Sequence, residues 1–252
     1  MSYLVISRIE VVNANSQPVW WVVGPPSPVA YCGFAHNVAR ELDVIAHFQG
    51  VVPVHHHYEL LADGNSPYQL AQNTLISHTD HVGKSKTKRG DMSGQPTARC
   101  NLIVSLAMKF DDKPGQRIDP DDVQEFIAKG ARIAGGNIRN TPGVRMVQEL
   151  SEARLRGFGL HQRLDLMSKG PLDVLQYCNL SKREEYPWLM LTTLGYRKLT
   201  DTSSTRASRD GYPHVYAEPL VAPVQYVSTR EKDPQCWQYT HDSDTFTVTT
   251  TN

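Results

Sequence analysis

Four cations fall within six positions of this sequence, at Lys84, Lys86, Lys88 and Arg89. Small hydroxyl residues separate the three lysines. Since side chains alternate along an extended chain, the lysines would share one side and form a positive ribbon that fits a phosphate backbone. The alternative is a solvated loop, which most charge runs are. The cluster lies in a long connection, residues 62–99, between two expected strands, so we expect a protruding β-hairpin that binds nucleic acid.

Three further segments combine turn-forming residues with amide or cationic side chains. The candidate binding residues in them are Asn13, Asn15, Arg132, Gly135, Gly136, Asn137, Arg139, Arg206 and Arg209. The first two asparagines offer amide donors and acceptors at a turn. The double glycine would let a backbone N–H approach a phosphate with no side chain in the way, and an ordinary helix C-cap is the alternative explanation. The last two arginines stand in a Ser/Thr-rich loop, residues 200–210, that could meet an anionic partner.

The histidines allow two chemical hypotheses. His55, His56 and His57 are consecutive in an expected strand, where only two of them could share a metal ion, and no acidic partner stands at a suitable spacing. We therefore expect no metal site. A metal-independent ribonuclease could be built from His36, Tyr31 and Lys84, as base and phosphate clamp. However, His36 falls on the small-residue face of an expected helix, where a core histidine is commoner.

The hydrophobic pattern predicts an α+β fold. Residues 4–12 alternate as a strand, and a turn is expected at residues 13–16. Ser27 before Pro28 marks the start of a helix over residues 29–42. Strands follow at residues 50–61 and 99–110. A second helix begins at Asp119-Pro120 and is expected to continue to the double glycine, before a strand from residue 137. This order is that of a ferredoxin-like or RNA-recognition-type (RRM) domain.

We therefore expect an RRM-like domain over residues 1–145, with the basic hairpin 62–99 inserted. Residues 146–252 would form an irregular C-terminal extension packed on the same body, with a strand near residues 188–196 and a fraying tail at 245–252.

Composition narrows the function classes. The chain has 252 residues, with 26 basic and 26 acidic side chains, so attraction to nucleic acid must come from local clusters. Its four cysteines are scattered, which favours reduced thiols over a disulfide framework or a zinc site. We see neither a secretion signal nor an apolar run of the ~20 residues that a membrane span needs, and expect a cytoplasmic protein without cofactors.

Two motifs in order resemble one family. They are Asn13-Ala14-Asn15 followed by Pro26-Ser27-Pro28 and Gly33-Phe34-Ala35-His36, and Ala131-Arg132-Ile133-Ala134-Gly135-Gly136-Asn137-Ile138. A weaker third match runs from Gly195-Tyr196 through Arg206, Asp210, Pro213 and Glu218 to Leu220. Together they resemble the Cas5-type (Csy2) subunit of type I-F CRISPR surveillance (Cascade or Csy) complexes, in the RAMP superfamily. The resemblance covers nearly the whole chain and is firm to about residue 138.

The resemblance implies a role in antiviral defence. A member of this family would have an RRM-type domain with a thumb-like hairpin and would bind the 5′ handle of the guide RNA (crRNA). Carried over by position, the resemblance implies that the RNA contacts the hairpin, the turn at Asn13 and Asn15, and the loop at Gly135, Gly136 and Asn137. It would cap the helical filament of backbone subunits beside the large Cas subunit, and contact with target DNA near the protospacer-adjacent motif is left open. Guide processing would belong to another subunit, so this chain would bind RNA and not cleave it. The alternatives are the ribonuclease above and a stand-alone RNA-binding module.

Overall fold

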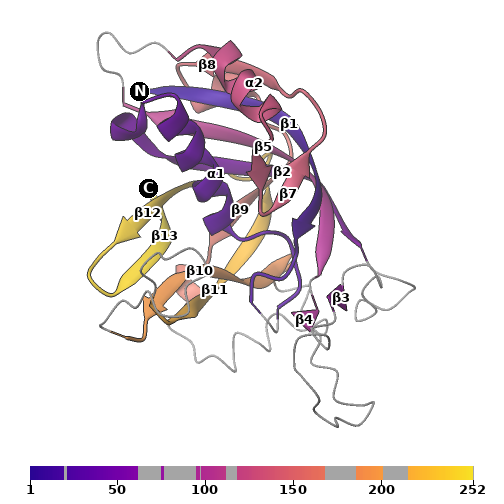
Figure 1. The fold of residues 1–252 in the computed structure, drawn as a ribbon, viewed down its shortest axis with the longest axis vertical. Coiled ribbons are helices and arrows are strands. Elements are labelled where there is room, and N and C mark those ends of the chain that lie inside the picture. Colours follow the sequence, from indigo (N-terminus) through magenta and orange to yellow (C-terminus); the bar gives the residue numbers. More distant parts are fainter. Residues whose placement is uncertain are drawn as a thin grey trace.

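The computed structural model describes residues 1–19, 22–61, 75–76, 95–96, 98–111, 118–167, 186–200 and 215–251. They form a mixed α+β fold, mostly antiparallel sheet with three α-helices (Figure 1). The helices are α1 (Pro28–Glu41), α2 (Pro120–Ala128) and α3 (Leu164–Met167), with 3-10 turns η1 (Ile45–His47) and η3 (Leu150–Ala153). The strands are β1 (Ser2–Asn15), β2 (Phe48–Leu61), β3 (Leu75–Ile76), β4 (Gln95–Pro96), β5 (Arg99–Phe110), β6 (Arg132–Ile133), β7 (Gly136–Ile138), β8 (Gly143–Val147), β9 (Phe158–Gln162), β10 (Leu189–Lys198), β11 (Ala217–Ser228), β12 (Cys236–His241) and β13 (Thr245–Thr251).

The long strands β2, β5 and β1 lie side by side in that order, all antiparallel, and β7 and β8 pair with the outer side of β1. The expected turn at residues 13–16 is wrong, because β1 continues to Asn15. Its register with β5 shifts twice, and the extra residues include Arg8 and Asn13, with φ of 52° and 60°. Asparagine tolerates this left-handed conformation better than most residues, so the bulge bends the strand without ending it.

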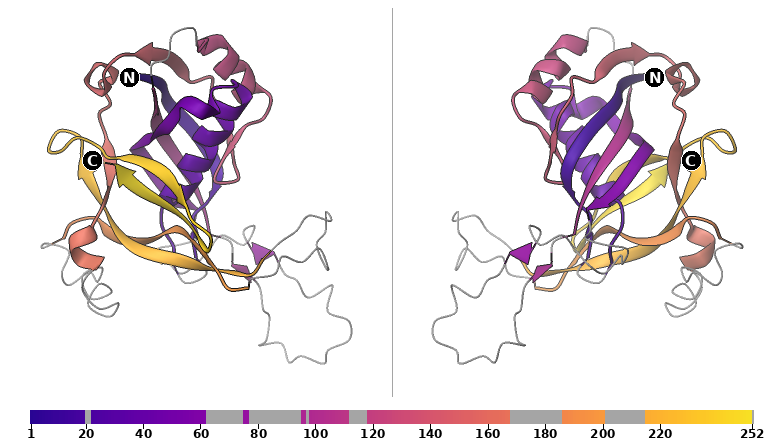
Figure 2. Two further views of the ribbon diagram at one scale, coloured as in Figure 1. Left: turned by 90° about the vertical axis from the view of Figure 1, so that its left-hand side faces the viewer. Right: turned by 90° about the vertical axis from the view of Figure 1, so that its right-hand side faces the viewer.

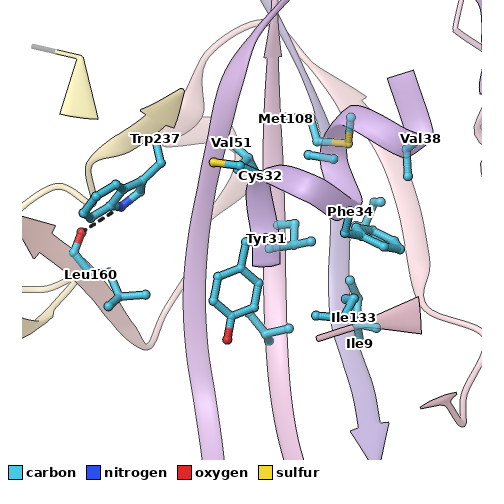
Figure 3. Packing of buried hydrophobic residues seen from close by; sticks show 14 of the residues in the cluster. Ile9, Tyr31, Cys32, Phe34, Val38, Val51, Met108, Ile133, Leu160 and Trp237 are labelled. Carbon is cyan, nitrogen blue, oxygen red and sulfur yellow. Dashed lines mark hydrogen bonds between the residues drawn. The ribbon is translucent and has the colours of Figure 1, made fainter. Parts of the chain in front are cut away.

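Helix α1 covers one face of this sheet, where Tyr31, Cys32, Phe34 and Val38 are buried in the main hydrophobic core (Figure 3). The Ser-Pro start of α1 is as the sequence predicted, with Pro at the first helical position. The placement of His36 on the core face is wrong, because this side chain is exposed.

Helix α2 also begins as predicted, and the Asp119 carboxylate accepts a hydrogen bond from the Asp121 N–H at 3.0 Å. The expectation that α2 continues to the double glycine is wrong. The helix ends at Ala128, and Gly130 follows with φ of +97°, a conformation that favours glycine and turns the chain out of the helix. The next residues then fold back as the β6–β7 hairpin.

The C-terminal strands make a second curved sheet that is continuous with the first (Figure 2). Successive antiparallel pairings run from β2 through β9, β11, β10, β13 and β12, and β12 returns to β2 by pairing Trp237 with Val51. These six strands therefore form a closed ring. An irregular C-terminal extension is wrong for the described residues, and the tail does not fray, since β13 pairs with both β12 and β10. The strand near residues 188–196 is confirmed as β10.

The fully buried Trp237 fixes the ring to the core (Figure 3). Its indole Nε1 donates to the Leu160 carbonyl at 3.2 Å, which joins β12 to β9 across 77 residues of sequence. Within the described helices, none is both long and apolar enough to span a membrane.

Candidate nucleic-acid interface

Strands β1 and β2 end, and β5 begins, at the same end of the sheet. Arg99, the first residue of β5, pairs with Leu61 at the end of β2 and with Asn15 at the end of β1. The expected hairpin therefore leaves and rejoins the sheet beside Asn15. Of residues 62–97, the structure describes only β3 and β4, which pair antiparallel. The four cations of the hairpin, Lys84, Lys86, Lys88 and Arg89, lie outside the described residues.

The structure brings the two predicted turn segments together at this edge. The Asn15 N–H donates to the Ala134 carbonyl at 2.9 Å, and Val12 of β1 pairs with Asn137 of β7. Asn13, Asn15 and Asn137 are all exposed. Residues more than 110 positions apart thus present amide groups on one surface, which we call the handle edge: Asn13, Asn15, Arg99, Asn101, Arg132, Gly135, Gly136 and Asn137.

The two glycines of the handle edge differ. Gly135 is exposed with φ of +75°, next to Ala134 with φ of +50°, so the tight β6–β7 turn needs a residue that accepts this conformation. Gly136 is buried, and a Cβ placed there would lie 2.7 Å from the Ala14 nitrogen. Gly135 therefore faces solvent, whereas Gly136 allows the hairpin to lie against β1. Neither is a helix C-cap.

Arg132 pairs with Asn137 across the β6–β7 hairpin, and both side chains are exposed. Arg139 is exposed one residue beyond β7, where its N–H donates to the Glu10 carbonyl at 2.9 Å. The two arginines thus flank the hairpin as the sequence suggested. Arg206 and Arg209 lie outside the described residues.

The candidate RNA-binding residues did not include Asn101, at the start of β5, and Arg99 was included only as the last residue of the expected hairpin. The Arg99 guanidinium donates through Nη1 to the Asn13 carbonyl at 3.3 Å. The Asn101 side chain accepts from the Asn13 N–H at 3.3 Å and donates to Glu59 at 3.2 Å. Asn101 was treated only as part of a strand, although a polar residue near the start of an apolar strand is a signal that could have indicated a position at the end of the sheet.

The three consecutive histidines separate in space. His55 is buried, His56 accepts or donates a 2.7 Å hydrogen bond with the Ser105 hydroxyl, and His57 is exposed. A register shift between His55 and His57 breaks the simple alternation of the strand. Among the described residues, no group of three His, Cys, Asp or Glu side chains is close enough to hold a metal ion.

The ribonuclease constellation does not assemble on α1. Tyr31 is fully buried and packs edge-on against His55, with ring centroids 5.2 Å apart, whereas His36 is exposed beside Phe48 and Tyr239. Five residues of helix turn the chain through about 500°, so the two side chains leave different sides of α1. Its third member, Lys84, lies outside the described residues.

A comparison with protein-family models matches residues 4–174 to the family described as CRISPR-associated protein (Cas_Csy2). The chain belongs to this Csy2 family. Membership implies a type I-F CRISPR-associated subunit, a structural component of a Csy complex that contains crRNA. The matched range covers the handle edge, both helices of the core and the first strand of the C-terminal ring. No curated protein matches the chain.

Proposed function

We propose that this chain is a non-catalytic subunit of a type I-F CRISPR surveillance complex that binds the 5′ handle of the crRNA. The observation that supports the proposal is the handle edge, where amides and cations from β1, β5 and the β6–β7 hairpin come together. It lies beside Leu61 and Arg99, between which the basic segment leaves and rejoins the sheet. Mostly single-stranded RNA is bound by backbone cations, base-edge hydrogen bonds and stacking, and the handle edge offers the first two.

The same proposal includes the finer architecture. The antiparallel order β2–β5–β1–β7, with α1 and α2 packed in the core on one face, supports an RRM-like domain over residues 1–145. The pairing of β3 with β4 supports a thumb-like hairpin over residues 62–99. Residues 146–252 would then be an extension on the same body, since β9 and β12 both pair with β2.

We further propose that the subunit caps the backbone filament beside the large Cas subunit, with the handle edge directed to the crRNA. Family membership supports the assembly of this chain into a Csy complex with a guide RNA. The resemblance of the sequence motifs supports the position of the subunit within that complex. Whether target DNA is also contacted would be decided by a structure of the assembled complex. Copurification tests the assembly: a chain that never enters a ribonucleoprotein particle when it is expressed with its operon neighbours is not such a subunit.

The salt dependence of RNA binding tests the handle edge. Substituting Arg132→Gln together with Arg139→Gln should reduce the slope of log affinity against log salt by about 0.7 for each lost phosphate contact. The matched control is Arg40→Gln with Lys109→Gln. It removes the same charge at the opposite end of the sheet, where Lys109 pairs with Tyr3 near the start of β1. A slope that falls equally in both double variants would refute a specific handle edge.

The basic segment is tested in the same assay. Replacing Lys84, Lys86, Lys88 and Arg89 together should flatten the salt slope further, and an unchanged slope would remove this segment from the RNA site.

Incubating the protein with repeat RNA in the absence of metal tests the ribonuclease alternative. Site-specific cleavage that is lost in His36→Ala would overturn the non-catalytic role.

A further inference from the structure

A pocket of about 260 Å³ opens where β2, β9 and β11 meet the residues that lead into β10. Its walls are largely aromatic. The side chains that matter for the argument are Pro25, His55, Tyr58, Phe158, Trp188 and Tyr226. The volume is below the roughly 300–1,000 Å³ of pockets for drug-sized ligands, so it suits a group of one or two rings.

The inner wall holds polar atoms without partners. His55 is only 4% exposed, and neither of its ring nitrogens has a hydrogen-bond partner in the described part of the chain. The Tyr226 ring lies edge-on to it at 5.0 Å between centroids, and the Tyr226 hydroxyl is likewise buried without a partner among the described residues. Buried polar groups are nearly always satisfied in folded proteins, so these atoms beside an open pocket are available to hydrogen-bond a group that enters it.

The protonation state of the inner wall defines the ligand's chemistry. Burial lowers the pKa of His55 to about 3 and raises that of Tyr226 well above its ordinary value. Both groups are therefore neutral at physiological pH, and a neutral imidazole has one donor and one acceptor. Neutral hydrogen-bonding groups match the edge of an uncharged heteroaromatic ring better than they match a phosphate.

The outer wall offers surfaces for stacking. Trp188 is 61% exposed and Phe158 is 44% exposed, and both line the same pocket, so their ring faces are accessible to a planar ligand there. Trp188 also has φ of +61°, and its carbonyl accepts a hydrogen bond from the Tyr226 N–H at 3.2 Å. A bulky residue fixed in the left-handed region is typical of binding sites, where the surrounding structure maintains the strain.

We propose that this pocket binds one unstacked base of the guide RNA, with Trp188 and Phe158 as stacking surfaces and His55 and Tyr226 as readers of the base edge. The inference rests on the proposed function. It is supported by the position of the pocket, because Tyr58, which lines it, is hydrogen-bonded at 2.7 Å to the Ser16 hydroxyl, directly after Asn15 of the handle edge. The pocket and the handle edge therefore lie near the same end of β1 and β2.

The test uses the full chain and synthetic 5′-handle RNAs of the cognate repeat, each with one abasic position. Wild-type protein should lose roughly tenfold in affinity at the position whose base enters the pocket, since stacking a base on an aromatic side chain contributes about that much. Trp188→Ala should lose a similar factor in affinity for intact RNA. Its affinity for that abasic RNA should be little lower than the wild-type affinity for it, because the protein change and the RNA change remove the same contact. The control is Tyr216→Ala, at an aromatic side chain that is 72% exposed outside the pocket. It should bind as wild type.

A second variant tests the base edge. His55→Phe preserves an aromatic ring and removes both nitrogens, so it should reduce discrimination among the four bases at the sensitive position. The pocket proposal is overturned if no abasic position stands out, or if Trp188→Ala binds as wild type. If the pocket proposal fails in this way but the Arg132/Arg139 double variant still flattens the salt slope, the proposed function is not refuted. RNA that does not bind at all would refute both.

Discussion

The handle edge depends on close backbone contact between β1 and the β6–β7 hairpin, and Gly136→Ala tests that contact directly. A Cβ at this position would lie 2.7 Å from the Ala14 nitrogen, 2.8 Å from the Ala14 Cα and 2.8 Å from Val11 Cγ1. Carbon atoms prefer separations of about 3.5–4.0 Å, so the hairpin would have to move away by several tenths of an ångström or more. Two of the three atoms belong to the backbone and have no rotamer that avoids the clash.

We expect Gly136→Ala to lower the free energy of unfolding by about 1–3 kcal/mol, the usual cost of forcing an extra carbon into a packed site. For a chain of this size that corresponds to a fall in Tm of about 2–12 °C, measured by circular dichroism during heating. The matched control is Gly143→Ala in β8, where a Cβ would meet no atom within 4 Å.

The control should leave stability unchanged or raise it by up to about 1 kcal/mol, because alanine loses less conformational freedom on folding than glycine. The two variants add the same methyl group to neighbouring strands, so composition and helix content do not differ between them. Equal melting temperatures for both variants and the wild type would show that the hairpin does not lie against Ala14, and the handle edge would have to be rebuilt.

Two other measurements test the core and the ring. Burial lowers the pKa of His55 to about 3 and that of His161 to about 4, so below pH 6.5 the unfolded chain binds more protons than the folded one. The free energy of unfolding should therefore fall from pH 6.5 towards pH 4, by about 1.4 kcal/mol per pH unit for each histidine, and a flat urea-denaturation profile would contradict neutral burial. Trp237→Phe, which removes the hydrogen bond to the Leu160 carbonyl, should cost about 1–3 kcal/mol. The exposed Trp188→Phe should stay within about 0.5 kcal/mol of wild type, and equal effects would argue against the closed ring.

The pocket shows why a binding site can be invisible in sequence. Its residues come from five separated segments, and none forms a motif with its sequence neighbours. His55 was visible only as one of three histidines, and the alternation of an ideal strand gave no reason to separate it from His57. A bulge between His55 and His57, which depends on pairing with β5, decides that His57 does not follow His55 to the core face and that Tyr58 packs there instead.

By itself, the sequence determined the α+β class, the family, the starts of both core helices and the main strands of the first sheet. These follow from local chemistry: Ser-Pro and Asp-Pro at helix starts, and apolar alternation along strands. The tertiary structure alone decided how the β6–β7 hairpin meets Ala14 and how β9 to β13 close a ring on β2. Those features depend on contacts such as Trp237 with Val51, between residues far apart in the chain, and local periodicity carries no information about which distant strand will be the partner.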